Sequence, residues 1–152
     1  MDTFTAVVSD LLVEIYYDVL RLEELALKKD TATSLTINEM HLIEIVGYAE
    51  EEGVTISELA ERLHISRPST TVAVNKLQKK GFVTKRDCEK DGRVVRVFLP
   101  AEGKKIFAYH KYYHRNMVNA LCKEFTDEEK EVLVRAIGKL NDYFKRSVGE
   151  KS

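Results

Sequence analysis

Apolar residues recur at helical spacing in two long stretches, one at each end of the chain. In residues 6–27 they fall on one face of a single helix: Val8, Leu11 or Leu12, Ile15, Val19, Leu22 and Ala26. A long helix is predicted from Pro100 to about Phe125, and a last helix follows the capping-box pair Thr126 and Glu129. The apolar face of this last helix comprises Val132, Leu133, Ala136, Ile137, Leu140, Phe144 and Val148.

Two further capping boxes, each a Thr followed three residues later by a Glu, lie between the long helices. Thr36 with Glu39 forms the first, and Thr55 with Glu58 forms the second. They predict helices over residues 37–48 and 56–63.

A third short helix follows almost at once. Ser66 can cap it, Pro68 fits its first turn because no N–H is needed there, and Gly81 can end it. Only His64 and Ile65 separate it from the preceding helix, so the two must cross sharply, as in a helix-turn-helix.

Two strands with a turn between them come next. Residues 82–86 and 94–99 are rich in Val and Phe, and the tip, residues 87–93, contains the turn dipeptide Asp91-Gly92. The pattern as a whole predicts a mainly α fold with a small β-hairpin wing, a winged helix-turn-helix between outer helices.

The charge is unevenly distributed. The chain has a net charge of −1, yet residues 66–86 carry six Lys or Arg and no Asp or Glu. Residues 1–56 carry three basic and twelve acidic side chains. Such a focused cationic segment indicates a polyanionic partner, and double-stranded DNA is the leading candidate.

The cationic helix offers short hydrogen-bonding side chains and two long cations at its start. We expect the exposed set to be Ser66, Arg67, Ser69, Thr70, Thr71, Asn75 and Lys76, with Val72, Val74 and Leu77 facing inward. At the hairpin tip, Arg93 could enter a minor groove and Lys90 could bind phosphate. Taken singly, these residues also suit plain helix caps, a solvated face and a surface turn.

Other classes of function find less support. The chain has no P-loop, no G-x-G-x-x-G and no nucleophile elbow, so we do not expect an enzyme. We expect no membrane span and no secretory signal, and the two cysteines, Cys88 and Cys122, fit a reducing cytoplasm. An adaptor that uses a winged helix to bind proteins is a third class.

The amphipathic outer helices exceed what one small domain can cover. We therefore expect them to bury their apolar faces against a second copy, in a two-fold homodimer, although they could pack on their own domain. The predicted divisions are residues 1–35 and 101–152 for dimerisation and 36–100 for DNA binding.

Several motifs resemble the MarR family of winged-helix regulators. They are TISELAERLHIS (55–66), the S-x-x-S/T-T-V-x-x-x-x-x-L-x-x-K-G run from Ser66 to Gly81, the wing Asp91-Gly92-Arg93, and the E-G-x-K that follows. The resemblance implies a homodimeric repressor of a pseudo-palindromic operator, with Arg93 in the minor groove. Pro100 stands where the family usually has Thr.

LEELALKK, NEMHLIEIVG and HKYYHRNMV look like the branch that represses fatty-acid synthesis genes. That branch implies acylated acyl carrier protein as co-repressor, with the acyl chain in a pocket between helices. Pocket-lining candidates are Leu11, Ile15, Leu22, Met40, Ile43 and Phe107, each of which also suits an ordinary core.

His110 and His114 lie four residues apart, a spacing that lets two imidazoles reach one metal ion. Together with Glu23 and His41 they resemble one site of the zinc-sensing MarR regulators, whose second, Cys-containing site is not reproduced. We expect no required cofactor; zinc is possible here, and a zinc-responsive regulator is the alternative function. Equally, such histidines can hydrogen-bond to carboxylates within a helix interface.

Overall fold

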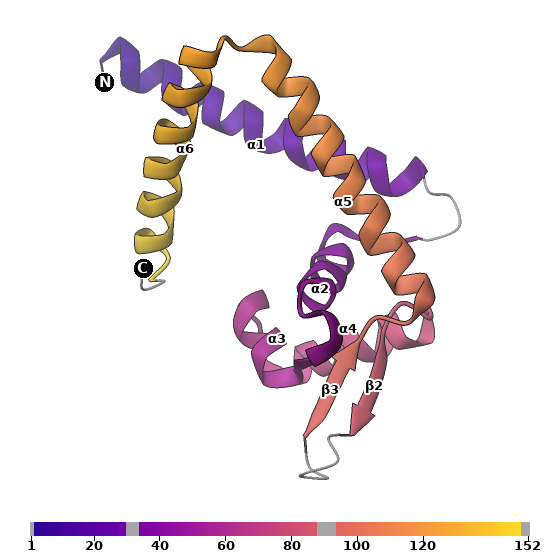
Figure 1. Cartoon of the computed structure of the whole chain (residues 1–152). Coiled ribbons are helices and arrows are strands. Elements are labelled where there is room, and N and C mark those ends of the chain that lie inside the picture. The colour runs from indigo at the N-terminus through magenta and orange to yellow at the C-terminus, as the bar shows by residue number, and fades with distance from the viewer. Residues whose placement is uncertain (1, 30–33, 88–93, 150–152) are drawn as a thin grey trace. The chain divides into compact units, whose positions relative to one another are not determined.

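The computed structural model describes residues 2–29, 34–87 and 94–149 (Figure 1). The chain divides into two compact units, residues 1–110 and 111–152, which are described separately. Helix α5 (Ala101–Leu121) contributes residues to both units.

The first unit is built on α2 (Ile37–Tyr48), which follows α1 (Thr3–Lys29). The predicted capping box starts α2: Glu39 N–H donates to Thr36 Oγ1, and Thr36 N–H donates to a Glu39 carboxylate oxygen. Six of the twelve residues of α2 are buried, and five of the six are apolar, so α2 forms the centre of the core. Its buried apolar residues are Met40, Leu42, Ile43, Ile45 and Val46.

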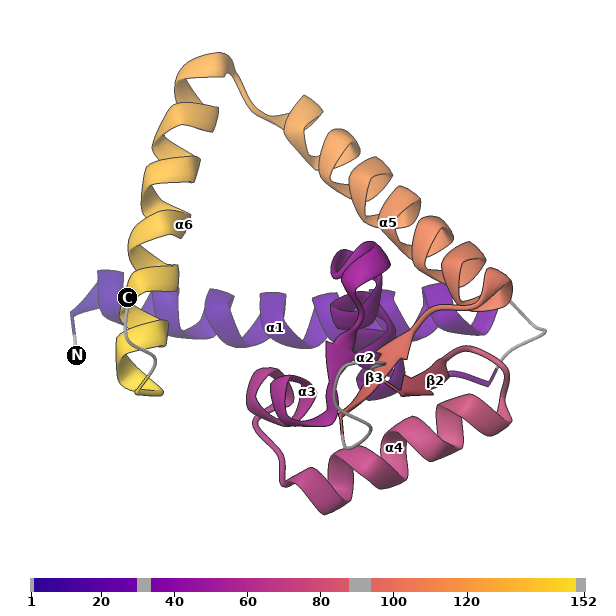
Figure 2. The same ribbon diagram turned by 60° about the horizontal axis from the view of Figure 1, so that its bottom comes forward.

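Helices α3 (Ile56–Leu63) and α4 (Arg67–Lys79) pack against each other across a tight turn (Figure 2). The capping box of Thr55 and Glu58 starts α3, and the left-handed His64 at φ 53° ends it. The short turn makes the two helices cross. The packing of the inner face of α4 on the core then fixes the direction of α4.

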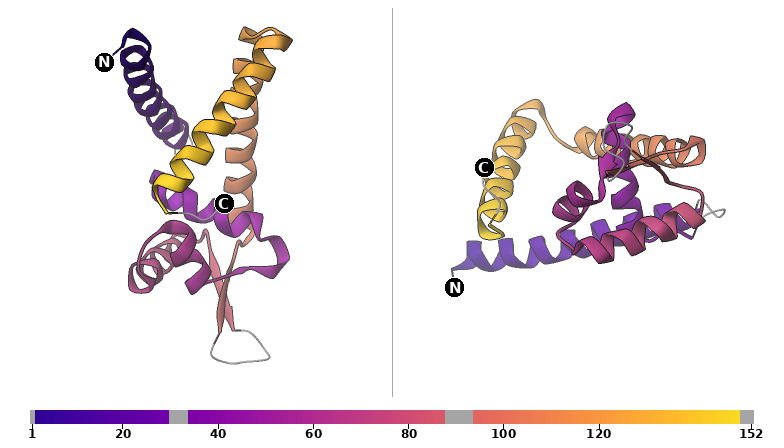
Figure 3. Two further views of the ribbon diagram at one scale, coloured as in Figure 1. Left: turned by 90° about the vertical axis from the view of Figure 1, so that its left-hand side faces the viewer. Right: turned by 90° about the horizontal axis from the view of Figure 1, so that it is seen from below.

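A three-stranded antiparallel sheet completes this unit, in the order β1-β3-β2. The hairpin strands β2 (Thr84–Asp87) and β3 (Val95–Phe98) were predicted, with ends one or two residues different (Figure 3). The sequence did not indicate β1 (Val54–Thr55), in which Val54 pairs with Val97 of β3. This short strand follows the 3-10 turn η1 (Glu50–Glu52) and ties the start of α3 to the hairpin.

Close approaches fix the beginning of α5, residues 101–110, within the first unit. A Cβ at Gly47 of α2 would lie 2.7 Å from atoms of the Phe107 ring. A Cβ at Gly103 would collide with the Phe82 carbonyl oxygen. Both glycines therefore allow the beginning of α5 to lie against the winged core.

The second unit contains the end of α5, the short 3-10 turn η2 (Cys122–Glu124) and α6 (Asp127–Ser147). The capping box of Thr126 and Glu129 is present at the start of α6, as predicted. None of the described residues of α6 is buried, and Val132, Val134 and Ile137 are all more than half exposed. Within the described residues, no helix combines the length and the hydropathy needed to cross a membrane.

Candidate nucleic-acid interface

Helix α4 begins at an exposed cap. Ser66 Oγ accepts a hydrogen bond from Ser69 N–H at 3.2 Å and lies 2.9 Å from Ser69 Oγ. Pro68 occupies the first turn, as expected. The N-terminus of a 13-residue helix with small polar side chains favours the close approach of an anion such as phosphate.

Six of the seven residues that we expected to be exposed on this helix are exposed: Ser66, Arg67, Ser69, Thr71, Asn75 and Lys76. For Thr70 the expectation was wrong, because its side chain is completely buried. Its hydroxyl donates to Ser66 O at 2.9 Å, so burial leaves the group satisfied. Thr70 shares the inner face of α4 with Val74 and Leu77.

Val72 was wrongly assigned to the inner face. It is 67% exposed and lies between the polar residues Thr71 and Asn75 on the outer side of α4. The inner face repeats at positions 70, 74 and 77, which leaves position 72 outward despite its apolar side chain. Val72 is therefore an additional candidate for contact with a ligand.

Asn75 has a partner on the hairpin. Lys85 Nζ of β2 donates to Asn75 Oδ1 at 2.7 Å. Because an ammonium group can only donate, the oxygen of the amide must face Lys85, and the NH₂ group faces away from it. Sequence reasoning did not connect Lys85 with Asn75.

A buried carboxylate pairs with the C-terminal half of α4. Glu39 is 7% exposed, and Lys80 Nζ donates to its two oxygens at 2.9 and 3.0 Å. Lys76 Nζ lies 3.2 Å from Glu39 Oε1, and Lys80 also donates to Ser34 O at 2.8 Å. Burial raises the pKa of Glu39, but the hydrogen bonds from Lys80, Thr36 and Lys76 outweigh it and hold the pKa below its ordinary value.

The cations of the hairpin differ in their surroundings. The Arg86 guanidinium lies 4.7 Å from the centre of the Phe98 ring, and Arg96 donates to Glu52 O and Gly53 O at 3.3 Å each. Arg96 thereby links β3 to η1. The two predicted tip contacts, Lys90 and Arg93, lie outside the described residues.

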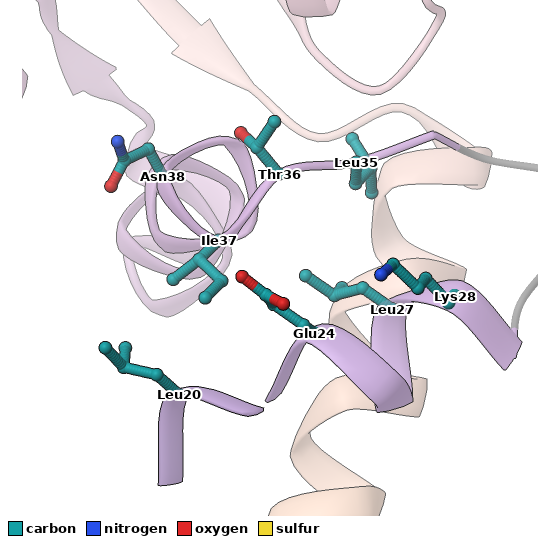
Figure 4. A pocket seen from close by; sticks show the side chains of 8 residues that line it. All are labelled: Leu20, Glu24, Leu27, Lys28, Leu35, Thr36, Ile37 and Asn38. Atoms are coloured by element: carbon teal, nitrogen blue, oxygen red, sulfur yellow. The ribbon is translucent and has the colours of Figure 1, made fainter. Parts of the chain in front are cut away.

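The residues predicted to line an effector pocket do not meet on one surface of the first unit. Met40 and Ile43 lie in its core, Leu11, Ile15 and Leu22 are exposed on α1, and Phe107 packs on Gly47. An open pocket of about 500 Å³ instead lies between α1 and the start of α2 (Figure 4). Its lining comprises Leu20, Glu24, Leu27, Lys28, Leu35, Thr36, Ile37 and Asn38.

His110 is held by two carboxylates. Its Nδ1 lies 2.9 Å from Glu44 Oε1 and its Nε2 lies 3.0 Å from Glu23 Oε2, and the side chain is 4% exposed. Burial lowers the pKa of His110, but the hydrogen bonds that the ring donates to the Glu44 and Glu23 carboxylates outweigh it, so the pKa is raised. The carboxylate partners that we weighed as the alternative to a metal are thus present.

The other two predicted metal ligands are His41 on α2 and His114 on α5. His41 is exposed on α2 and joins no group of three candidate ligands within the described parts of the chain. His114 lies one turn beyond His110 on α5. With Glu44 on Nδ1 and Glu23 facing Nε2, His110 suits a metal only if the ion replaces the Nε2 proton, an arrangement known from carboxylate–histidine–metal sites.

Comparisons with known proteins find similarity to transcriptional regulators. Residues 33–94 match the sequence model of the MarR family. The HTH-type transcriptional repressor YetL of Bacillus subtilis is 28% identical over 92 residues, 60% of this chain and 55% of that protein. This chain therefore spans little more than half the length of that relative.

The transcriptional regulator ZitR of Lactococcus lactis is 27% identical over 119 residues, 76% of this chain and 80% of that protein. A crystal structure of Streptococcus pneumoniae FabT in complex with DNA superposes with a TM-score of 0.88 at 28% identity. That superposition covers 93% of this chain and 98% of the other. The segment matched by the MarR family model contains α2, α3, α4 and β2, so the similarity to that family covers the helix-turn-helix and the first strand of the hairpin.

Proposed function

We propose that this protein is a transcriptional regulator that binds double-stranded DNA with α4 in the major groove. The observation that carries the proposal is the outer face of α4, which is exposed, short-chained near its N-terminus and cationic at Arg67, Lys76 and Lys79. A helix of these dimensions fits the major groove, and its first turns provide the base-edge contacts. The similarity to FabT, which was crystallised with DNA, supports the same use of the fold.

The proposed active form is a homodimer. On α1, Phe4, Ile15 and Tyr17 are each more than half exposed in the single chain, and α6 has no buried residue among those described. A second copy is the simplest partner that covers such faces on both outer helices. A two-fold dimer would also place two copies of α4 on successive major-groove turns of a pseudo-palindromic operator.

The regulated process is proposed from the sequence motifs that resemble the fatty-acid-synthesis branch. In this proposal the protein represses those genes, with acylated acyl carrier protein as co-repressor. The overall similarity to FabT, over nearly the whole chain, supports this choice among the MarR branches. The exposed apolar residues of α1, including Leu11, Ile15 and Leu22, are the predicted acyl contacts that a dimer would enclose.

DNA binding is tested by selecting duplexes from a random pool and measuring affinity by fluorescence anisotropy across a salt series. We expect a selected inverted repeat and an affinity that falls steeply with salt, because phosphate contacts release counterions. Arg67→Ala and Arg93→Ala should each cost about 1–3 kcal/mol of binding if they make specific contacts. Lys104→Ala, which removes an exposed cation from α5, is the matched control. If no duplex binds at low salt, the proposal is refuted.

The co-repressor is tested by adding acyl carrier protein with and without a long acyl chain to the protein and its selected duplex. We expect only the acylated form to increase affinity. An equal effect of both forms, or none, would reject this part while leaving DNA binding intact.

Zinc responsiveness is the second candidate, favoured by the short distance of 3.0 Å between Glu23 Oε2 and His110 Nε2, two atoms that can both ligate zinc when the ion replaces the proton between them. Zinc titration followed by native mass spectrometry should then show one ion per chain that is lost in His110→Gln. A duplex affinity that does not change with zinc would argue against a sensing role.

A further inference from the structure

The outer face of α4 presents an apolar and an amide group side by side. Val72 and Asn75 are separated by three positions, so they lie on the same side of the helix, one turn apart. Val72 is 67% exposed, and Asn75 is also exposed. Both therefore remain available for a ligand after α4 has packed on the core.

The amide is oriented before any ligand binds. Asn75 Oδ1 accepts the hydrogen bond from Lys85 Nζ at 2.7 Å, so its NH₂ group is directed away from the half-buried lysine. An asparagine that contacts adenine in the usual paired way must use its oxygen as an acceptor and its nitrogen as a donor. With the oxygen already bonded to a cation, Asn75 is better suited to bases that offer an acceptor.

Thymine is the base that matches both groups. In the major groove it presents the O4 acceptor beside the C5-methyl group, whereas cytosine presents a donor and no methyl. We propose that Val72 and Asn75 together recognise a thymine, with the Val72 side chain against the C5-methyl and Asn75 Nδ2 donating to O4. This inference rests on the proposed DNA binding, and it names the residues that set its base preference.

The first test removes one methyl group from the DNA. Each thymine of the selected duplex is replaced in turn by deoxyuridine, which keeps base pairing and O4 but lacks the C5-methyl. We expect one thymine in each half-site at which the replacement weakens binding by about fourfold, the value of one buried methyl. In Val72→Ala this sensitivity should disappear, and in Val72→Thr, which keeps one methyl, it should persist in part.

The second test addresses the orientation of the amide. At the same position, thymine is replaced by cytosine, and the ratio of the two affinities is measured for the wild type and for Lys85→Met. We expect the wild type to discriminate at least tenfold and the variant to discriminate less, because the freed amide can turn its oxygen toward the cytosine donor. Lys79→Met is the control. It removes a cation from α4 and should weaken binding to the thymine and the cytosine duplex equally.

The outcomes separate the proposals. If no thymine shows a methyl effect that depends on Val72, the contact with the C5-methyl is refuted. If Lys85→Met retains the full discrimination against cytosine, the orientation of Asn75 by Lys85 is refuted. In both cases the protein still binds its duplex, so the proposed function stands; loss of all duplex binding by the wild type would instead refute that function.

Discussion

Glu39 connects the start of α2 to the recognition helix, and its charge can be removed with little change in shape. Glu39→Gln keeps an oxygen that can accept from Thr36 N–H, so the capping box is preserved. It loses the negative charge that accepts from Lys80 at 2.9 and 3.0 Å and pairs with Lys76 at 3.2 Å. The substitution therefore tests the charge of Glu39 rather than its packing.

The contribution of this charge follows from the exposure of each partner. Lys80 is 26% exposed, and its bond to a buried carboxylate belongs to the class worth about 1.5–3 kcal/mol. Lys76 is 61% exposed, so solvent screens its pairing and adds no more than about 0.5 kcal/mol. We expect Glu39→Gln to lower the free energy of unfolding by about 2 kcal/mol at pH 7.

The dependence on pH gives the decisive comparison. Because the pKa of Glu39 is lowered on folding, the stabilisation is complete above its ordinary value of 4.5 and is lost as the pH falls through the lower folded value. The free energies of unfolding of the wild type and Glu39→Gln are measured by urea unfolding, followed by circular dichroism, between pH 7 and pH 3.5. The difference between them should stay constant down to about pH 4.5 and become smaller below that pH. Lys76→Met is the control and should differ little from the wild type. If the two free energies of unfolding are equal at pH 7, or if their difference does not become smaller in acid, the stabilisation does not come from the charge of Glu39.

Three further substitutions test other contacts. Thr70→Val removes a buried hydroxyl that donates to Ser66 O. We expect urea unfolding to show a free energy of unfolding lower by about 1 kcal/mol, with unchanged affinity for the duplex. Weaker binding by the folded variant would show that Thr70 belongs to the DNA interface. Gly47→Ala places a Cβ 2.7 Å from the Phe107 ring, and calorimetry should show a loss of about 1–3 kcal/mol unless the ring moves aside at no cost. For His110, whose pKa is raised on folding, the stability advantage of the wild type over His110→Gln should be fully present below the ordinary value of 6.5. This advantage should shrink as the pH rises above 6.5, and an advantage that grows with pH would contradict the two carboxylate bonds.

Features specified by neighbouring residues could be predicted from the sequence. All three Thr-x-x-Glu capping boxes are present where expected, because the two partners lie three residues apart and satisfy each other. The turn at His64 and the end of α4 before Gly81, at φ 82°, were likewise predicted from local chemistry.

Features that depend on distant partners could not be predicted. Strand β1 has only two residues and exists because Val54 pairs with Val97, more than forty positions later. Lys80 is likewise forty-one positions from Glu39, so nothing near either residue indicates their bond. The same limit applies to Lys85 and Asn75, which lie on different elements.

The inward and outward positions of Thr70 and Val72 on α4 were predicted wrongly because the prediction relied on side-chain polarity. A valine at position 72 and a threonine at position 70 suggested an inner Val72 and an outer Thr70, and the helix has the opposite arrangement. Burial of Thr70 costs little because its hydroxyl bonds within the same helix, to the carbonyl four residues earlier. Exposure of Val72 also costs little, since single apolar side chains are common on protein surfaces. Neither residue has a strong enough preference to override the packing of Val74 and Leu77.

The residues of α4 that hold the helix in place differ from the residues that are exposed to DNA. Thr70, Val74 and Leu77 secure the inner face, while the ion pairs of Glu39 secure the C-terminal half. The outward positions, such as Ser69 and Val72, make no contribution to the buried core, and substitutions at such surface sites usually change stability by less than about 0.5 kcal/mol. The base preference of α4 can therefore change without loss of the fold, whereas a change at Thr70 or Glu39 must alter stability first. A set of variants at Ser69, Val72 and Asn75 should accordingly select different duplexes at nearly constant unfolding free energy. Parallel losses of stability in that set would show that the outer face also holds the helix in place.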